Sequence, residues 1–284
     1  MENELKRLKK EAVQIRRDII EMAAKGHGGA IHVGPALSSA DMVAALYFKL
    51  LNVDPKNPTW QDRDRFILSK GHAYAVVYSA LAEKGFFPRE ELLTARAINS
   101  RLQGHPVLGK TPGIDMVSGS LGNGLSCGAG IAIGLKKQCR HASVYVMLGD
   151  GESQEGMIWE AAMFAANRRL DNLVAIVDHN HFQSCGAVDE IMSLYPLADK
   201  WKSFGWQVME MNGHDMGDIV RTLSMAKEFA GRPVCVIAHT VKGKGVSFTE
   251  HNNKWHVGRC SQEQYEQAMK ELDEQEAAID AGWM

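Results

Sequence analysis

The 284-residue sequence lacks an excess of one charge sign, a long apolar run and a paired set of cysteines. Its 32 basic and 34 acidic side chains give a formal net charge of −2. No field of one sign is therefore present to hold nucleic acid or an anionic lipid surface. The mean hydropathy is −0.22 and the apolar runs are short, so no segment is predicted to span a bilayer. We expect neither nucleic acid nor a membrane among the partners.

The five cysteines lie at wide intervals without a CxxC pair. This pattern predicts reduced thiols and excludes a disulfide framework or a zinc cluster. Residues 1–22 form a charged amphipathic helical pattern without the apolar core of a signal peptide, so we predict a cytoplasmic location. The sequence also has no HExxH, GxSxG or GxxxxGK[ST], the usual signatures of zincins, α/β-hydrolases and P-loop NTPases.

What the sequence does contain is a series of short apolar runs that each end in a turn signal. They cover residues 65–72, 143–151, 173–180, 206–215 and 232–240. Most are separated by helical patterns, which predicts βαβ units. We therefore predict an α/β fold, with an open, mostly parallel sheet and helices on both faces. One domain is predicted over 1–284, with a helix over 36–52 and with a loop and a final helix near 261–275 in the segment 241–284.

Ligands of such a sheet bind at the carboxyl ends of its strands. Asp150 lies in a Gly-Asp-Gly turn after one run, and Asn180 follows the next run. Consecutive parallel strands can bring these two residues to one edge, where a carboxylate and an amide oxygen suit Mg²⁺ or Ca²⁺. A plain glycine turn followed by an Asx turn is the alternative. The 30-residue spacing in a strand–helix–strand context favours the metal site.

A glycine-rich helical pattern covers residues 117–137. It contains Gly122, Gly124, Gly128, Gly130 and Gly134. Each glycine inside a helix costs ~1 kcal/mol relative to alanine, so these positions need an offsetting reason. Two reasons stay open, namely close approach of the backbone to a ligand and tight packing against another element. The pairs four residues apart are expected to line narrow grooves.

Several histidines follow glycines or lie in loops near the predicted strand ends. His72 is in SKGHA, His105 in QGHPV, His32 in AIHVGPALS and His256 in NKWHVG. A single loop histidine is usually solvated. A group of them beside a phosphate and metal site is better explained as ligands or proton carriers.

Taken in order, these motifs resemble the transketolases. The Gly-Asp-Gly turn with an Asn about thirty residues later resembles the thiamine diphosphate fingerprint, and LSKGHAYAVVYSAL, GSLGNGLSCGAGIAIG, GDGESQEG, VDHNHFQ and VKGKGVSF follow in the family's order. The resemblance extends from about residue 10 to residue 260. It covers the amino-terminal, diphosphate-binding half of a typical transketolase and implies a thiamine diphosphate-binding domain of the PP type.

The resemblance also implies roles for individual residues. Asp150 and Asn180 would bind Mg²⁺ through their side chains and Phe182 through its carbonyl, with Ca²⁺ or Mn²⁺ as possible substitutes. The residues that would contact the cofactor are His72, Gly119, Ser120, Leu121, Asp150, Gly151, Asn180 and His256. The residues that would act in catalysis are His32, His72, His105, His256, Glu155 and Glu160. The two glutamates match carboxylates between the active sites of transketolase dimers, so partners across an interface are expected for them.

The implied reaction is the transfer of a two-carbon ketol unit from a ketose phosphate to an aldose, with thiamine diphosphate as the electron sink. The pyrimidine-binding half of a transketolase is absent from this sequence. The chain therefore resembles the first subunit of a split transketolase. It is expected to be active only with a carboxy-terminal partner subunit, as an α2β2 assembly acting on phosphorylated or otherwise anionic sugars.

Several alternatives stay open at this point. When the sequence is aligned to the family without a gap, His32 and not His27 matches the family's first histidine. The family's HPGG motif then corresponds to HVGP in this sequence. Because this loop lies near the sugar, the substrate stays open between pentose phosphates and sulfonated or branched sugars. The α-chain of a thiamine-dependent 2-oxo acid dehydrogenase and a non-enzymatic cofactor-binding remnant are the rival functions. Lys242 and Lys244 are interpreted as a solvated basic loop in preference to an anion site.

Overall fold

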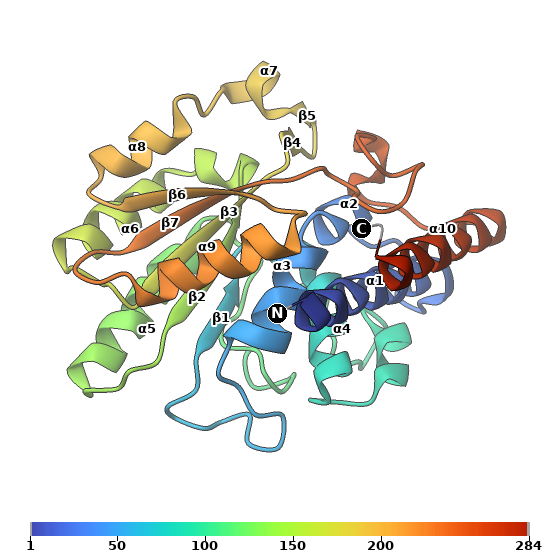
Figure 1. Cartoon of the computed structure of the whole chain (residues 1–284), viewed down its shortest axis with the longest axis horizontal. Coiled ribbons are helices and arrows are strands. Elements are labelled where there is room, and N and C mark those ends of the chain that lie inside the picture. The colour runs from blue at the N-terminus through green and yellow to red at the C-terminus, as the bar shows by residue number, and fades with distance from the viewer. Residues whose placement is uncertain (1, 283–284) are drawn as a thin grey trace.

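A five-stranded parallel sheet forms the centre of the molecule in the computed structural model, which describes residues 2–282 (Figure 1). The order is β1-β2-β3-β7-β6, and every neighbouring pair is parallel. The strands are β1 (Arg65–Leu68), β2 (Val144–Gly149), β3 (Leu173–His179), β6 (Gln207–Asn212) and β7 (Val234–His239). Each of the five predicted runs contains one of these strands, so the predicted sheet is confirmed.

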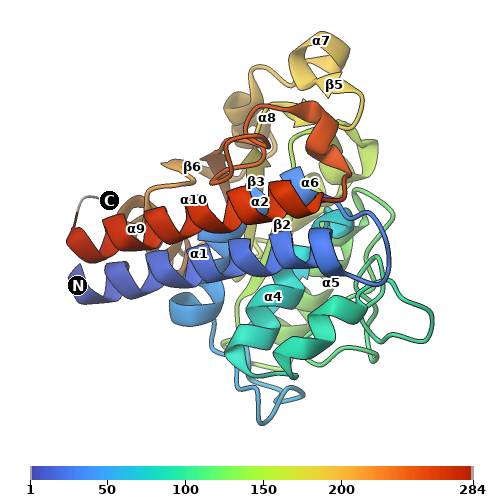
Figure 2. The ribbon, with the colours of Figure 1, turned by 90° about the vertical axis from the view of Figure 1, so that its right-hand side faces the viewer.

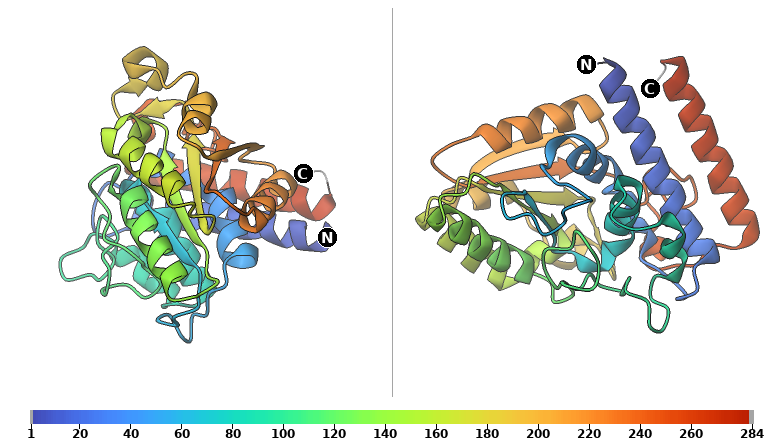
Figure 3. Two further views of the ribbon diagram at one scale, coloured as in Figure 1. Left: turned by 90° about the vertical axis from the view of Figure 1, so that its left-hand side faces the viewer. Right: turned by 90° about the horizontal axis from the view of Figure 1, so that it is seen from below.

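Helices cover both faces of the sheet, as the alternation of apolar runs and helical patterns predicted (Figures 1 and 3). Along β2, Tyr145 and Met147 point into one core, whereas Val146 and Leu148 point into the other. The first core contains α3 (Ala40–Ala45), α4 (Tyr74–Lys84) and α9 (Met216–Glu228). The second contains α5 (Asn123–Lys137), α6 (Gly156–Asn167) and α8 (Leu197–Ser203).

The helix predicted over 36–52 is interrupted, and that prediction is wrong in detail. The chain forms α2 (Val33–Leu37), a turn at Ser38 and Ser39, α3, and a π-helical turn over Leu46–Leu50. The hydroxyl of Ser39 donates to the carbonyl of Pro35 at 3.1 Å, and the hydroxyl of Ser38 lies 3.2 Å from the same oxygen. Hydroxyls that bond the preceding backbone in this way compete with regular helix formation. The same turn also supplies polar atoms to the strand ends, as described below.

Two long helices at the ends of the chain lie side by side (Figures 2 and 3). They are α1 (Glu2–Lys25) and α10 (Gln262–Ala281), and Arg17 pairs with Glu276 at 2.7 Å between them. A capping box at Ser261 begins α10. The predicted final helix is therefore confirmed and continues to Ala281. The predicted single domain over 1–284 includes residues 1, 283 and 284, which lie outside the described residues.

Between β3 and β6 the chain leaves the sheet and forms a small extension. It consists of a hairpin of β4 (Phe182–Gln183) and β5 (Gly186–Ala187), followed by α7 (Val188–Met192). Within residues 2–282, no helix has both the length and the apolar character needed to cross a membrane.

The glycines of α5 divide into two groups. An added Cβ on Gly124 would lie 2.3 Å from the Ser69 side chain, and one on Gly128 would lie 2.5 Å from Val146. Tight packing of the helix on β1 and β2 therefore explains these two. Added Cβ atoms on Gly130 and Gly134 would meet no described atom within 4 Å. The groove expected at this second pair is not formed by the described part of the chain.

Candidate active site

A cavity of about 500 Å³ lies at the carboxyl ends of β1, β2 and β3. Its walls come from the segments after these strands, the start of α2, the loop before α5 and the loop after β7. The lining residues are His32, Pro35, Lys70, His72, His105, Gly119, Leu121, 149–152, Gln154, Glu155, Asn180, 182–184, His256 and Val257. Residues separated by more than 200 positions in the sequence thus meet at one edge of the sheet.

Three histidines form a close group in this cavity. The ring centroids of His32 and His72 are 5.1 Å apart, and His256 lies 5.4 Å from each. Burial, together with the neighbouring cationic groups, lowers the pKa of His32 to about 4 and that of His256 to about 3. The pKa of His72 is also lowered, chiefly by burial and then by Lys70. These rings are therefore neutral near pH 7 and can donate or accept one hydrogen bond per nitrogen.

The carboxylate of Asp150 is buried without a cationic partner among the described residues. It is 2% exposed and accepts hydrogen bonds from the backbone amides of Gly151, at 2.7 Å, and His181, at 2.5 Å. Burial and the negative charge of Asp178 raise the pKa of Asp150 to about 7. A bound cation would offset both effects.

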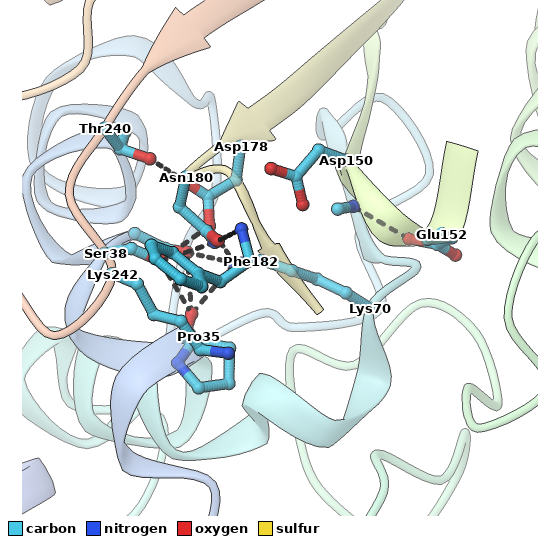
Figure 4. A network of polar contacts seen from close by, with 12 residues as sticks. Pro35, Ser38, Lys70, Asp150, Glu152, Asp178, Asn180, Phe182, Thr240 and Lys242 are labelled. Atoms are coloured by element: carbon cyan, nitrogen blue, oxygen red, sulfur yellow. Dashed lines mark hydrogen bonds and ion pairs between the residues drawn. The ribbon is translucent and has the colours of Figure 1, made fainter. Parts of the chain in front are cut away.

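Asp178, at the end of the neighbouring strand, is fully paired (Figure 4). Its carboxylate forms an ion pair with Lys70 and accepts from the hydroxyls of Ser38 and Thr240 and from the amide of Asn180. Burial alone would raise the pKa of Asp178, but Lys70 and these donors hold it below its usual value. The pair is therefore charged and satisfied in the interior.

The ammonium of Lys70 also connects the turn before α3 to the sheet. It donates to the carbonyl of Pro35 at 2.8 Å and to the hydroxyl of Ser39 at 2.6 Å. The sequence-based prediction used the histidine of SKGHA and missed this lysine. The available signal was a lysine at the end of a buried apolar strand, where a charge needs a partner.

Glu152 was also missed, and its role is structural. The carboxylate is 3% exposed and accepts from the backbone amides of Gly122 at 2.8 Å and Gly149 at 2.9 Å, as well as from the hydroxyl of Ser69. It thereby joins the ends of β1 and β2 to the start of α5. The Gly-Asp-Gly-Glu turn is held in place by this side chain.

The interpretation of Lys242 as part of a solvated loop is wrong. Lys242 is 1% exposed, and its ammonium contacts Asn253 at 2.6 Å, the Nδ1 atom of His256 at 2.9 Å and the carbonyl of Gln183 at 3.3 Å. Burial lowers the pKa of Lys242 to about 8. Lys244 is more exposed and pairs with Glu250 at 3.2 Å. The two lysines of this loop thus lie in different environments.

Most residues singled out from the sequence meet at the cavity, and two do not. The lining includes His32, His72, His105, His256, Gly119, Leu121, Asp150, Gly151, Asn180, Phe182 and Glu155. Ser120 is exposed between two lining residues, and Glu160 is exposed on α6 outside the cavity. His27, the alternative first histidine, is exposed and does not line the cavity. The interface partners expected for Glu155 and Glu160 lie beyond this single chain, so that expectation stays a prediction.

The residues present fit a divalent cation beside a diphosphate. No group of three His, Cys, Asp or Glu placed to hold a metal ion is found in residues 2–282. Asp150 supplies a buried carboxylate, Asn180 an amide and Phe182 a carbonyl, the oxygen donors preferred by Mg²⁺. A Cβ on Gly151 would lie 2.7 Å from Gln183, so only glycine fits in this part of the wall.

The chain is similar to known proteins over nearly its whole length. Residues 7–276 match the family model described as transketolase, thiamine diphosphate binding domain. The chain belongs to the transketolase family. It is 43% identical to a 6-deoxy-6-sulfo-D-fructose transketolase subunit of a Clostridium species, over 95% of this chain and 98% of that protein. It is 44% identical to an apulose-4-phosphate transketolase subunit of Phocaeicola vulgatus, over 91% of each chain.

The structural comparison agrees with this assignment. A crystal structure of transketolase from Campylobacter jejuni matches with a TM-score of 0.85 and 27% identity, covering 99% of this chain and 46% of that one. The chain thus corresponds to the thiamine diphosphate-binding part of transketolases and spans less than half of that enzyme's length. The interpretation of the motifs as those of a transketolase, including the split form, is confirmed, and the 2-oxo acid dehydrogenase alternative is not favoured.

Proposed function

We propose that this chain is the diphosphate-binding subunit of a two-subunit, Mg²⁺-dependent transketolase that carries out ketol transfer in the cytoplasm. The observation that supports the proposal most directly is the cavity at the strand ends, which is lined by a group of neutral histidines and by a buried carboxylate that has no cationic partner among the described residues. A cytoplasmic location is supported by five free cysteines, three of which are exposed.

In this proposal, Asp150, Asn180 and the carbonyl of Phe182 hold Mg²⁺, and Gly151 lets the diphosphate approach the backbone. His256 lines the cavity and Lys242 contacts its Nδ1 atom, and we assign both as donors to the diphosphate oxygens. His72, Gly119, Ser120 and Leu121 are assigned to the remaining cofactor contacts. When bound, thiamine diphosphate supplies the electron sink for breaking the carbon–carbon bond of the donor sugar.

The contribution of this chain is to position the cofactor and to handle protons. His32 and His105 are assigned to the hydroxyl groups of the sugar. Because their pKa values are lowered, both rings keep an unprotonated nitrogen that can accept a hydroxyl proton near pH 7. The Nδ1 atom of His32 is buried without a hydrogen-bond partner among the described residues, which suits a ring that bonds its ligand.

The remaining parts of the active site are assigned to a partner subunit. Exposed Glu160 lies on the same helix as exposed Met163 and Phe164, which are 60% and 41% exposed. An exposed apolar pair beside a carboxylate is typical of a protein interface. We propose that this helix contacts the partner, in an α2β2 assembly in which Glu155 and Glu160 become buried.

The sugar is proposed to be a phosphorylated ketose such as xylulose 5-phosphate. A second candidate is supported by the two split transketolase subunits, whose names give a sulfonated sugar and apulose 4-phosphate as their sugars. The HVGP sequence at 32–35 departs from the family pattern next to His32, so a departure in the sugar is consistent with it.

The test is a ketol-transfer assay with thiamine diphosphate and Mg²⁺. This chain is assayed alone and after co-expression with the product of the adjacent reading frame, with xylulose 5-phosphate and ribose 5-phosphate as substrates. The same preparations are then given 6-deoxy-6-sulfo-fructose or apulose 4-phosphate. We expect activity only in the preparation in which this chain is co-expressed with its partner. Full turnover by the isolated chain would refute the need for a partner, and activity with the second set alone would assign the other sugar class.

A further inference from the structure

The turn at Ser38 and Ser39 and the first residues of α3 take part in two separate polar networks. Ser38 and Ser39 face the strand ends and bond Asp178 and Lys70. Asp41, two residues later, belongs to a second network with Arg16 and His214. Arg16 and Asp41 are only 4% and 8% exposed, and the guanidinium bonds both carboxylate oxygens. None of these three residues lines the cofactor cavity.

Both partners of Asp41 hold the segment that follows β7. The backbone amide of Val241 donates to Nε2 of His214 at 2.8 Å, and Nε of Arg16 donates to the carbonyl of Lys244 at 3.0 Å. Arg16 also lies against Gly245, where an added Cβ would be 2.7 Å from its side chain. The segment 241–244 is therefore held at both ends by groups that bond one carboxylate.

The protonation of His214 follows from these bonds. Because Nε2 accepts from the amide of Val241, the ring proton lies on Nδ1 and is donated to Asp41 at 2.8 Å. The imidazole can make both bonds only in this neutral form. It thus acts as an oriented link between a buried carboxylate and the backbone immediately before Lys242.

Lys242 is the residue of this segment that contacts the cavity wall, because its ammonium lies 2.9 Å from His256 and 3.3 Å from the carbonyl of Gln183, which both line the cavity. Its stem packs on Gly34, where an added Cβ would lie 3.2 Å from Cγ, and its ammonium reaches His256. We propose that Asp41, Arg16 and His214 are positioning residues for diphosphate binding, because they fix segment 241–244 and thereby place the ammonium of Lys242. The inference rests on the proposed function, in which Lys242 contacts the diphosphate.

Two substitutions of His214 separate this role from general stabilisation. In His214→Asn, the shorter amide can still reach Asp41 but leaves the amide of Val241 without its acceptor. In His214→Gln, the longer side chain brings an acceptor back to the position of Nε2. His239→Ala is the matched control, because His239 makes a 2.8 Å bond to Glu210 at the neighbouring strand ends and does not contact the segment.

Each variant is purified with its partner subunit, and three quantities are measured. Thiamine diphosphate binding is followed by calorimetry with saturating MgCl₂, kcat and the donor KM are measured at saturating cofactor, and hydrogen exchange is followed at residues 241–251. His214→Asn should weaken cofactor binding about tenfold and speed exchange in the segment, while the donor KM stays within about twofold. His214→Gln should restore most of the affinity, and His239→Ala should match the wild type.

A third variant covers the case in which His214→Asn does not fold. His214 borders a cavity of about 340 Å³ on the outer side of this network, so in His214→Ala added imidazole can enter the vacated space. Imidazole should then restore cofactor affinity.

The inference fails if folded variants bind thiamine diphosphate as the wild type does, even when exchange is faster. It also fails if neither glutamine nor imidazole restores affinity. A wild-type complex that does not bind thiamine diphosphate would instead overturn the proposed function.

Discussion

The aspartates at the ends of β2 and β3 are neighbours with opposite electrostatic situations. Asp178 has a lysine, two hydroxyls and an amide as partners, and its pKa is held below the usual value. Asp150 has two backbone amides and a pKa raised to about 7. Both side chains are buried, so burial alone does not distinguish a structural carboxylate from a ligand-binding carboxylate. The number and charge of the partners do.

The largest expected effect comes from breaking the ion pair between Lys70 and Asp178. Asp178→Asn leaves the ammonium of Lys70 buried without its counter-charge, and we expect a loss of about 3–5 kcal/mol in the free energy of unfolding. Urea unfolding at constant pH measures it. The double variant Lys70→Met with Asp178→Leu should recover part of the loss, because no unpaired charge remains. Equal losses in the single and double variants would mean that the pair does not act as a unit.

A second test uses the raised pKa of Asp150. A carboxyl whose pKa is about 7 in the folded chain and 3.8 unfolded binds its proton more tightly when folded, so its contribution to stability falls as the pH rises from about 4 to 7. This difference corresponds to at most about 4 kcal/mol. Without metal, the Asp150→Asn variant should therefore have a higher melting temperature than the wild type at pH 8. At pH 4 the two melting temperatures should be equal. The melting temperatures of both proteins in a chelator, from pH 4 to 8, provide the measurement.

A third test asks whether Asp150 is the ligand-binding carboxylate. We expect Asp150→Asn to raise the Mg²⁺ concentration needed for half-maximal activity of the complex on the order of 100-fold, because an anionic ligand is lost. Asp199→Asn is the control, since Asp199 is exposed on α8 and pairs only with Lys202 among the described residues. An unchanged Mg²⁺ requirement in Asp150→Asn would show that the metal is bound elsewhere.

The smallest effect extends the comparison to the two buried lysines. Lys70 forms an ion pair with Asp178, whereas Lys242 contacts His256 of the cavity wall and has a pKa lowered to about 8. Lys242→Gln should weaken thiamine diphosphate binding about tenfold with little change in melting temperature. Lys70→Gln should lower the melting temperature far more. If both substitutions mainly lower the melting temperature, Lys242 is a structural residue as well.

The features that could be predicted from the sequence were those with a local signal. Apolar runs followed by glycine or polar turns gave every strand of the sheet, and Asp150 and Asn180 were placed at one edge because consecutive parallel strands are neighbours. Lys70 and Asp178 were not assigned and Lys242 was interpreted as solvated, because the local sequence does not show which distant residue a charged side chain will contact. Lys70 and Asp178 are buried as partners of each other across 108 positions of the sequence, and Lys242 is buried by contacts with Gln183, Asn253 and His256.

The break in the helix at Ser38 and Ser39 had the same cause. A serine pair in a helical pattern is ordinary until the sheet edge supplies Asp178 and Lys70 as partners. The two α5 glycine pairs were likewise indistinguishable by spacing, although one packs on β1 and β2 and the other meets open space. Long-range contacts decided each of these outcomes.

The pairing of α1 with α10 has a practical consequence for protein engineering. Lys6 and Lys10 both contact Asp280, so the start of α1 and the end of α10 lie together on one side of the molecule (Figure 2). A short linker between them would allow a circular permutant that opens in the loop between the π-helical turn and β1, where Lys56 and Asn57 are exposed. Such a rearranged chain would keep the order of the strands and place both new ends before β1, whereas the cavity lies at the carboxyl ends of the strands.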